Sequence, residues 1–350
     1  MIPPPRVLVS CVMPLGSIAG HPRLLSLLSR AMARQTLPPA LLLSGPGGVG
    51  KRTTALALAE TLNCPQPRTL GNWLEIDACG ACASCRRIAR GVHPDVIVLE
   101  PGETGAIRID EVRDVIDRAN YRPFEGRRRV VIVDEADTMA PAAQNALLKT
   151  LEEPPSASVF MLVSSMPDAL LPTVRSRCPR LRFGALLAAD VAGVLMRDHG
   201  YTEAEARAAA ADADGSIGCA LAVRNVDLVG ARDAAQRLLE HAARVSNPVH
   251  RLELARNLTG KKSATAAERD QLAVCLRALA SLLRDLGVLA VRADTSSLAN
   301  ADLQADLGPL SDAFDSERST RAFTAVDRAL GALERNVGPK VVADWLVLQL

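Results

Sequence analysis

The sequence predicts an α/β fold in which a mostly parallel sheet is covered by helices and followed by purely helical segments. Three observations predict it. Short β-type runs alternate with helical runs from Ala40 to Phe183. A glycine-rich turn separates the first strand from the helix after it. No strand pattern follows Phe183, and a chain of 350 residues that is 48% apolar exceeds what one core usually organises.

The expected strands are bounded by glycine, proline or polar residues, as is usual for strands buried in a sheet. They are Ala40 to Ser44, Asp95 to Leu99, Arg129 to Val133, Ser158 to Ser164 and Arg180 to Phe183. Helical patterns between them include Lys51 to Leu62 and Pro141 to Glu152. Beyond the sheet, helical patterns cover Thr202 to Ala213, Ala234 to Val245, Gln271 to Leu289 and Arg318 to Asn336, and the polar stretch Arg292 to Asp302 predicts a loop.

These patterns divide the chain into three predicted domains. Residues 1–184 form the α/β core, which includes a cysteine-rich insert between residues 64 and 85. Residues 185–227 form a small helical domain that is interrupted at Gly215. Residues 228–350 form a larger helical domain.

Charge and hydropathy exclude several classes of protein. The 41 basic residues nearly balance the 39 acidic ones, so the net charge of +2 does not suit a protein that coats nucleic acid. No apolar run approaches the length of a membrane-spanning helix, and the N-terminus lacks the pattern of a secretory signal. We therefore expect a cytoplasmic protein without a membrane partner, whose thiols stay reduced.

The glycine-rich turn predicts a phosphate-binding loop. A strand, a glycine-rich turn and a helix in that order place backbone N–H groups and the positive end of a helix around an anion. Lys51, at the start of the helix, would reach the β- and γ-phosphates of ATP or ADP. The plain alternative is a glycine turn with a chance lysine. The expected phosphate-binding residues are Gly45, Gly47, Gly48, Val49, Gly50 and Lys51.

The residue after the lysine departs from the usual pattern. A Ser or Thr normally stands there and binds Mg²⁺ through its hydroxyl, whereas this chain has Arg52. Thr53 is a poor substitute, because one residue along a helix rotates the side chain by about 100°. We expect a loop that can hold phosphate but has an incomplete Mg²⁺ site.

A second acidic motif completes the predicted nucleotide site. The apolar strand Arg129 to Val133 delivers Asp134 to its carboxyl end, where the carboxylate could hold Mg²⁺. Glu135 could polarise a water for attack on the γ-phosphate. The alternative is a buried strand that ends in a solvated acidic turn.

Four cysteines crowd into the insert and predict a metal site. Cys79, Cys82 and Cys85 are spaced two residues apart, and Cys64 completes a set of four. Four thiolates match the tetrahedral preference of structural Zn²⁺. An iron–sulfur cluster and a redox dithiol are the alternatives.

Eight strings of residues between Ile18 and Cys178 resemble the clamp-loader branch of the AAA+ ATPases. They are Ile18 to His21, the phosphate loop, the four-cysteine insert, His93 to Asp95, Ile107 to Arg113, the Asp134-Glu135 strand, Asn145 to Pro155 and Leu171 to Cys178. The resemblance implies an AAA+ core of the RecA-like P-loop type with a zinc insert, a helical lid domain and a helical collar domain. It also places a zinc ligand at Cys64, although the spacer Pro65 to Ala78 is longer than the family's usual gap.

The resemblance assigns further roles to single residues. Arg177 in the Ser-Arg-Cys triplet corresponds to an arginine finger that acts in the ATP site of a neighbouring subunit. Ser164 or Ser165 corresponds to the polar residue that senses the γ-phosphate. The family's lid string Gly-Ser-x-Arg is here Gly215-Ser216-Ile217-Gly218, so its arginine is missing. Arg52 also replaces the hydroxyl that would bind Mg²⁺, so two contributors to hydrolysis are missing. Glu135 is then a vestigial base, and hydrolysis of ATP by this chain should be absent or very slow.

The function implied is that of a largely non-motor subunit in a hetero-oligomeric ring that loads the sliding clamp onto DNA during replication. The other subunits are the direct partners, and the clamp and DNA are reached through the ring. The alternative is a self-sufficient ATPase, either a clamp-loader motor or a helicase loader. The leucine stripe that begins at Leu272 would pack on neighbouring subunits or, more simply, in the domain's own core.

Overall fold

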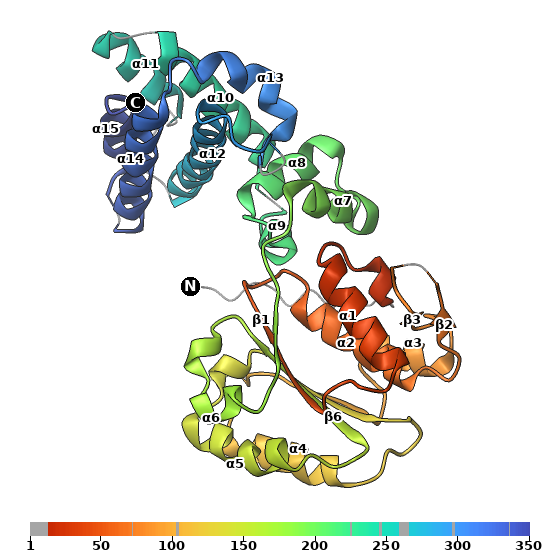
Figure 1. The fold of residues 1–350 in the computed structure, drawn as a ribbon. Coiled ribbons are helices and arrows are strands. Elements are labelled where there is room, and N and C mark those ends of the chain that lie inside the picture. The colour runs from red at the N-terminus through yellow and green to blue at the C-terminus, as the bar shows by residue number, and fades with distance from the viewer. Residues whose placement is uncertain are drawn as a thin grey trace. The chain divides into compact units, whose positions relative to one another are not determined.

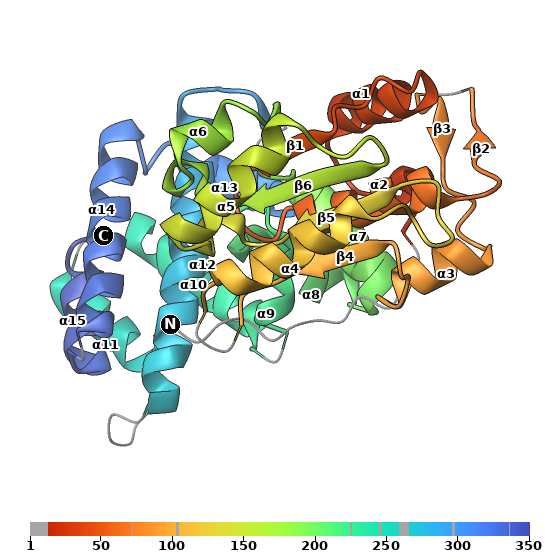
Figure 2. The same cartoon turned by 90° about the horizontal axis from the view of Figure 1, so that it is seen from below.

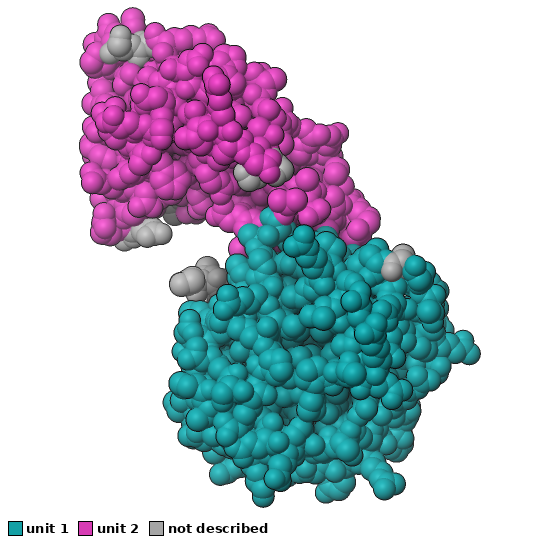
Figure 3. All heavy atoms as spheres, in the orientation of Figure 1, with its two compact units in different colours: residues 1–186 teal, residues 187–350 magenta. Residues whose placement is uncertain are grey.

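The computed structural model describes residues 13–71, 73–102, 105–224, 226–244, 247–258, 266–295, 298–335 and 337–350. The chain separates into two compact units, residues 1–186 and residues 187–350, which Figure 3 colours teal and magenta. The first unit carries every predicted site residue. Within the second, the predicted division into a lid (185–227) and a collar (228–350) stays a prediction.

The first unit is built on a five-stranded parallel sheet, which confirms the predicted α/β class. Its strands, in sheet order, are β4 (Val96–Leu99), β5 (Arg129–Val133), β6 (Ser158–Ser164), β1 (Ala40–Ser44) and β7 (Arg180–Arg182). The bounds of β1, β5 and β6 agree with the sequence prediction, whereas β4 begins one residue later and β7 ends one residue earlier. Because β1 lies between β6 and β7, the chain leaves β1 at the interior of the sheet, where ligands of such folds bind beyond the carboxyl ends of the strands.

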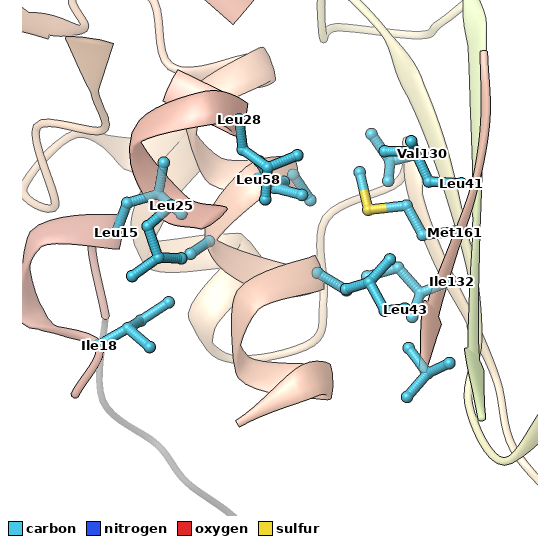
Figure 4. Packing of buried hydrophobic residues seen from close by; sticks show 14 of the residues in the cluster. Leu15, Ile18, Leu25, Leu28, Leu41, Leu43, Leu58, Val130, Ile132 and Met161 are labelled. Atoms are coloured by element: carbon cyan, nitrogen blue, oxygen red, sulfur yellow. The ribbon is translucent and has the colours of Figure 1, made fainter. Parts of the chain in front are cut away.

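Helices cover both faces of this sheet, as Figures 1 and 2 show. One face packs against α1 (Pro22–Ala33) and α2 (Lys51–Asn63), and the other against α4 (Ile109–Asn120), α5 (Pro141–Glu152) and the short α6 (Pro172–Arg175). Alternate strand residues serve the two layers: Leu41 and Leu43 face the first, Ala40 and Leu42 the second. Figure 4 shows the first layer, in which Leu58 of α2 lies between the strands and α1. This burial on both faces explains why the strands read as continuous apolar runs.

The cysteine insert follows α2 and forms a small subdomain. It contains a two-stranded antiparallel ribbon, β2 (Arg68–Thr69) and β3 (Ile76–Asp77), and then α3 (Ala83–Ala89). The buried Asp77 carboxylate accepts hydrogen bonds at 2.9 Å from the backbone N–H groups of Leu15 and Gly16 in the 3₁₀ turn η1 (Leu15–Ser17). The insert is thereby tied to the N-terminal part of the core.

The second unit is helical. Its helices are α7 (Ala188–His199), α8 (Glu203–Asp212), α9 (Ile217–Ala222), α10 (Leu228–Arg244), α11 (Pro248–Leu258), α12 (Ala266–Ala290), α13 (Gln304–Leu307), α14 (Ser316–Glu334) and α15 (Pro339–Val347). α10 begins six residues before the predicted start, because Leu228 and Ala231 are buried and Asp227 accepts a hydrogen bond from Gly230 N–H at 2.8 Å. Within the described residues, no helix is long and apolar enough to cross a membrane.

The leucine stripe of α12 belongs to the core of its own unit. α12 packs against α10 and α14. The side chains of the stripe are at most 1% exposed: Leu272, Leu276, Leu279, Leu282, Leu283 and Leu286. These leucines are therefore not available to pack on neighbouring subunits, and the simpler of the two interpretations is correct.

Candidate nucleotide and metal sites

The phosphate loop is shaped by glycine backbone conformations that other residues rarely adopt. Gly45, Gly48 and Gly50 have φ angles of +148°, +70° and +96°. A Cβ on Gly45 would lie 2.1 Å from the carbonyl oxygen of Phe183, so the loop passes too close to the end of β7 for any side chain. His21 supports the loop from outside: its Nε2 lies 3.4 Å from the Val49 carbonyl oxygen, and its ring packs edge-on against Phe183.

Lys51 points back into the loop. Its side chain is 6% exposed, and the ammonium donates to the carbonyl oxygens of Gly45, at 2.7 Å, and Pro46. Burial lowers the pKa of Lys51, while the carboxylates of Asp134 and Asp137 oppose that shift. A buried ammonium that bonds the loop's own carbonyls, beside two carboxylates, is a cation held ready for phosphate oxygens. The residues of the loop therefore fit the di- or triphosphate of a nucleotide.

Arg52 pairs with the carboxylates beside the phosphate loop, including Asp134, which the sequence predicts as a Mg²⁺ ligand. Its guanidinium NH1 donates to Asp134 Oδ2 at 2.8 Å, and NH2 pairs with Glu100, the residue directly after β4. Burial lowers the pKa of Arg52, but the two carboxylates raise it by more, so the arginine stays charged. Thr53, one position further along α2, is half-buried. The site thus has an arginine, and not a hydroxyl, beside Asp134 at the end of β5. These residues do not fit Mg²⁺.

The acidic turn after β5 lies at the same edge of the sheet. Asp134 Oδ1 accepts a hydrogen bond from the backbone N–H of Glu135, which is exposed and has a φ of +47°. Asp137 accepts from both the N–H, at 3.1 Å, and the hydroxyl, at 3.4 Å, of Ser165. The hydroxyl of Ser164 is buried and has no hydrogen-bond partner among the described residues. Ser165 is therefore the serine that is joined to the acidic turn.

Arg177 comes before the amino end of β7, whereas the phosphate loop follows the carboxyl end of the neighbouring strand β1. It comes three residues before β7, and β7 runs parallel to β1 with Arg180 opposite Leu42 and Arg182 opposite Ser44. Since the phosphate loop follows the carboxyl end of β1 and Arg177 precedes β7, the three residues of β7, about 10 Å of strand, separate the two along the sheet. Its guanidinium donates to the Thr173 carbonyl at 2.8 Å and pairs with Glu152 at the end of α5. Arg177 is thus not placed to act on a nucleotide in its own loop.

The four cysteines of the insert come together. All four Sγ atoms of Cys64, Cys79, Cys82 and Cys85 lie within 4.8 Å of one another. Cys64 and Cys85 are buried, and the other two are partly exposed. Backbone N–H groups point at the sulfurs: Cys79 N–H donates to the Cys64 Sγ at 3.4 Å, and Cys82 N–H to the Cys79 Sγ at 3.3 Å. The long spacer before Cys79 folds as the β2–β3 ribbon and returns the chain to Cys64.

This donor set fits a tetrahedral metal ion. Zn–S bonds of about 2.3 Å require sulfurs about 3.8 Å apart, and the observed spread allows this with little movement. A hydrogen bond from the Ala81 backbone N–H, together with others from the same turn, lowers the pKa of Cys79 to about 6, which favours a thiolate ligand. Because all four donors are protein thiols, a metal here has a closed coordination shell and a structural role.

Sequence reasoning did not identify two acidic residues near these sites. Glu100 is one of the two partners of Arg52, and its place directly after a strand could have marked it. Glu60 is 2% exposed on α2, and burial, with smaller effects of Asp77 and Cys79, raises its pKa to about 8. No sequence signal singled out Glu60, because its burial follows from the packing of the insert on α2.

Comparisons with known proteins agree with the resemblance found in the sequence. Residues 20–186 match the family model described as "DNA polymerase III, delta subunit". The DNA polymerase III subunit delta′ of Pseudomonas aeruginosa is 45% identical over 140 residues, 40% of this chain and 41% of that protein. The gamma/tau subunit of Mycobacterium bovis is 36% identical over 180 residues, 51% of this chain and 30% of that protein. The chain thus spans less than half the length of these curated relatives.

Solved structures give a looser likeness. A DNA polymerase III gamma-subunit-related protein of Thermotoga maritima aligns with 91% of this chain and 97% of its own, at 18% identity and a TM-score of 0.41.

The sequence strings resemble the delta-prime subunit of bacterial DNA polymerase III, and the family model and the Pseudomonas relative confirm this resemblance. The sheet, the phosphate loop and the cysteine cluster agree with an AAA+ core that carries an insert. Over residues 20–186 the chain is therefore similar to the clamp-loader subunits of DNA polymerase III.

Proposed function

We propose that this chain is a largely non-motor subunit of the DNA polymerase III clamp loader, which helps to hold the ring and completes a neighbour's ATP site. In such a ring it would contact gamma/tau-type and delta-type subunits and meet the sliding clamp and DNA through the assembly. Its own contribution to catalysis is then Arg177, supplied in trans. The protein would work in the cytoplasm, at the replisome.

The observation that carries this proposal is the position of Arg177. Its guanidinium lies toward the amino ends of the strands, whereas its own phosphate loop follows the carboxyl end of β1, and this position supports a role at a nucleotide held by another chain. An arginine supplied in trans stabilises the charge that develops on the transferred phosphoryl group, worth about 10³–10⁵ in rate in related enzymes. The partner Glu152 holds the guanidinium at the surface, where its side chain is 32% exposed.

The chain's own nucleotide site supports a non-motor role. Arg52 occupies the Asp134 carboxylate that a motor would use for Mg²⁺. In the predicted lid, Ser216 caps α9 by accepting a hydrogen bond from Cys219 N–H at 3.1 Å, and the exposed Gly218 stands where the family's lid arginine would be. Two contributors to hydrolysis are missing, each worth a few kcal/mol in the transition state.

The cysteine cluster supports the assignment to the clamp loader, because the resemblance to that family implies a zinc insert at this place in the chain. We propose Zn²⁺ as its metal, bound by Cys64, Cys79, Cys82 and Cys85. A closed tetrathiolate site stabilises the insert without chemistry of its own.

The alternative, a self-sufficient ATPase, is tested by phosphate release from the isolated chain with ATP and Mg²⁺. The proposal predicts a rate no higher than that of the Lys51→Ala variant, which lacks the phosphate-binding cation. A Lys51-dependent rate in the range of the motor subunits would contradict the non-motor role. Failure of the chain to enter a complex with the other loader subunits would contradict the clamp-loader role altogether.

A further inference from the structure

The phosphate loop is intact while the metal site beside it is filled by a side chain. In a P-loop ATPase, the hydroxyl after the lysine and the aspartate of the neighbouring strand hold Mg²⁺ against the β- and γ-phosphates. Here Lys51 keeps its place in the loop, and the next residue, Arg52, bridges Asp134 and Glu100. The cation of the site is therefore part of the chain.

The stability of α2 does not explain this arginine. A cation in the first turn of a helix faces the positive end of the helix dipole and costs a few tenths of a kcal/mol. A half-exposed ion pair recovers about 0–1 kcal/mol, and the Arg52 side chain is 47% exposed. The exposure also leaves part of the guanidinium accessible to a bound anion.

The carboxylates of the site are already neutralised. Asp134 is 14% and Glu100 26% exposed at the side chain, and each has an Arg52 nitrogen as its partner. A Mg²⁺ ion could reach Asp134 only by displacing the guanidinium, and it would then lie beside two fixed cations, Lys51 and Arg52. This repulsion is absent from a site that has a hydroxyl at position 52.

We propose that this phosphate loop binds nucleoside di- and triphosphates as their metal-free anions, with Arg52 in place of Mg²⁺. The inference deepens one part of the proposed function, the nucleotide site, and is independent of the role of Arg177. A subunit with such a site holds its nucleotide without the ion that hydrolysis requires.

The test is calorimetric titration of the full chain with ADP, once in EDTA and once in excess Mg²⁺. We expect the wild-type protein to bind ADP in EDTA, with an affinity that Mg²⁺ leaves within about twofold or weakens. The Arg52→Thr variant restores the usual hydroxyl and should bind about tenfold more tightly with Mg²⁺ than without it. Arg113→Thr, on the exposed face of α4, is the matched control and should behave as the wild type.

Three results would overturn the proposal: no binding of ADP to the wild type in EDTA, binding that Mg²⁺ strengthens about tenfold, or an Arg52→Thr variant whose binding ignores Mg²⁺. Circular dichroism shows whether the variant is folded, and the wild-type comparison decides the question even if it is not. An assembled loader that still depends on Arg177 would leave the proposed function intact in each case.

Discussion

Arg52 donates a 2.8 Å hydrogen bond to the carboxylate of Asp134, joining the first turn of α2 to the end of β5. These two positions normally hold a Mg²⁺ ion between them. In this chain the two side chains form an ion pair with each other, and Glu100 is the second carboxylate that pairs with the guanidinium. On our proposal, this one residue separates two properties of the P-loop fold, because the loop keeps its phosphate-binding residues and loses its Mg²⁺ site.

Gly45→Ala should destabilise the core. The added Cβ would meet the Phe183 carbonyl oxygen at 2.1 Å, and the φ of +148° is unfavourable for alanine, so β7 must move away from β1. We expect the free energy of unfolding, measured with urea, to fall by about 2–4 kcal/mol. Gly47→Ala is the control, because nothing lies within 4 Å of its added Cβ. Equal effects of the two substitutions would show that the close approach at Gly45 is unimportant.

Asp95→Asn should be costly, because Asp95 organises the loop that leads into β5. Its fully buried carboxylate accepts hydrogen bonds of 2.7–2.9 Å from the backbone N–H groups of Phe124, Glu125 and Gly126, and pairs with Arg129 at 2.8 Å. An amide would turn a donor toward these donors and leave Arg129 without its counterion. We expect a loss of about 3–5 kcal/mol. Asp110→Asn, an exposed change on α4, should cost less than about 0.5 kcal/mol.

The same carboxylate predicts a pH dependence. Burial raises the pKa of Asp95, but the hydrogen bonds from Glu125, Arg129, Phe124 and Gly126 lower it by more, to about 2, against an ordinary value of 3.8. The unfolded chain therefore takes up the proton first as the pH falls. The stabilisation, about 2 kcal/mol, is complete above about pH 5 and is lost toward pH 2. Urea unfolding at pH 7 and pH 3 should show about half of this loss in the wild type, and an unchanged stability would refute it.

Metal analysis should return about one zinc per chain and no iron. Cys79→Ser removes one of the four thiolates and should lower the content below half an equivalent and expose the insert to proteolysis. Cys219→Ser, at an exposed thiol of the second unit outside the cluster, should keep its zinc. A wild-type protein with less than half an equivalent of zinc, or with iron and labile sulfide, would contradict the zinc assignment.

Local signals in the sequence were enough to predict the positions of the strands and of the phosphate loop. A buried strand between two helical layers is a continuous apolar run, so the bounds of β1, β5 and β6 followed from composition alone. The starts of α10 and α12 were missed, because the sequence before each predicted start carries a weak apolar pattern. The leucines of α12 show a similar limit, since an apolar stripe does not reveal what covers it.

The site was predictable as a set of residues, but not as a set of contacts. Position 52 lacks the expected hydroxyl, which the sequence shows directly. The pairing of Arg52 with Asp134 and Glu100 joins α2 to the ends of β4 and β5, which lie far apart in the chain, and no local pattern contains it. Nor could spacing alone bring Cys64 to the other cysteines, because the β2–β3 ribbon takes up the long spacer.

The most direct test of the account is the Arg177→Ala variant in a loader reconstituted with the other subunits, assayed for DNA-stimulated ATP hydrolysis. Arg175→Ala is the matched control: the two side chains are 33% and 32% exposed at Arg175 and Arg177, and each pairs with one carboxylate. If Arg177 completes a neighbour's ATP site, its variant should assemble normally and lose at least about 90% of the activity of the site it serves, whereas the control keeps it. Full ATPase activity in a correctly assembled Arg177→Ala complex would contradict the account.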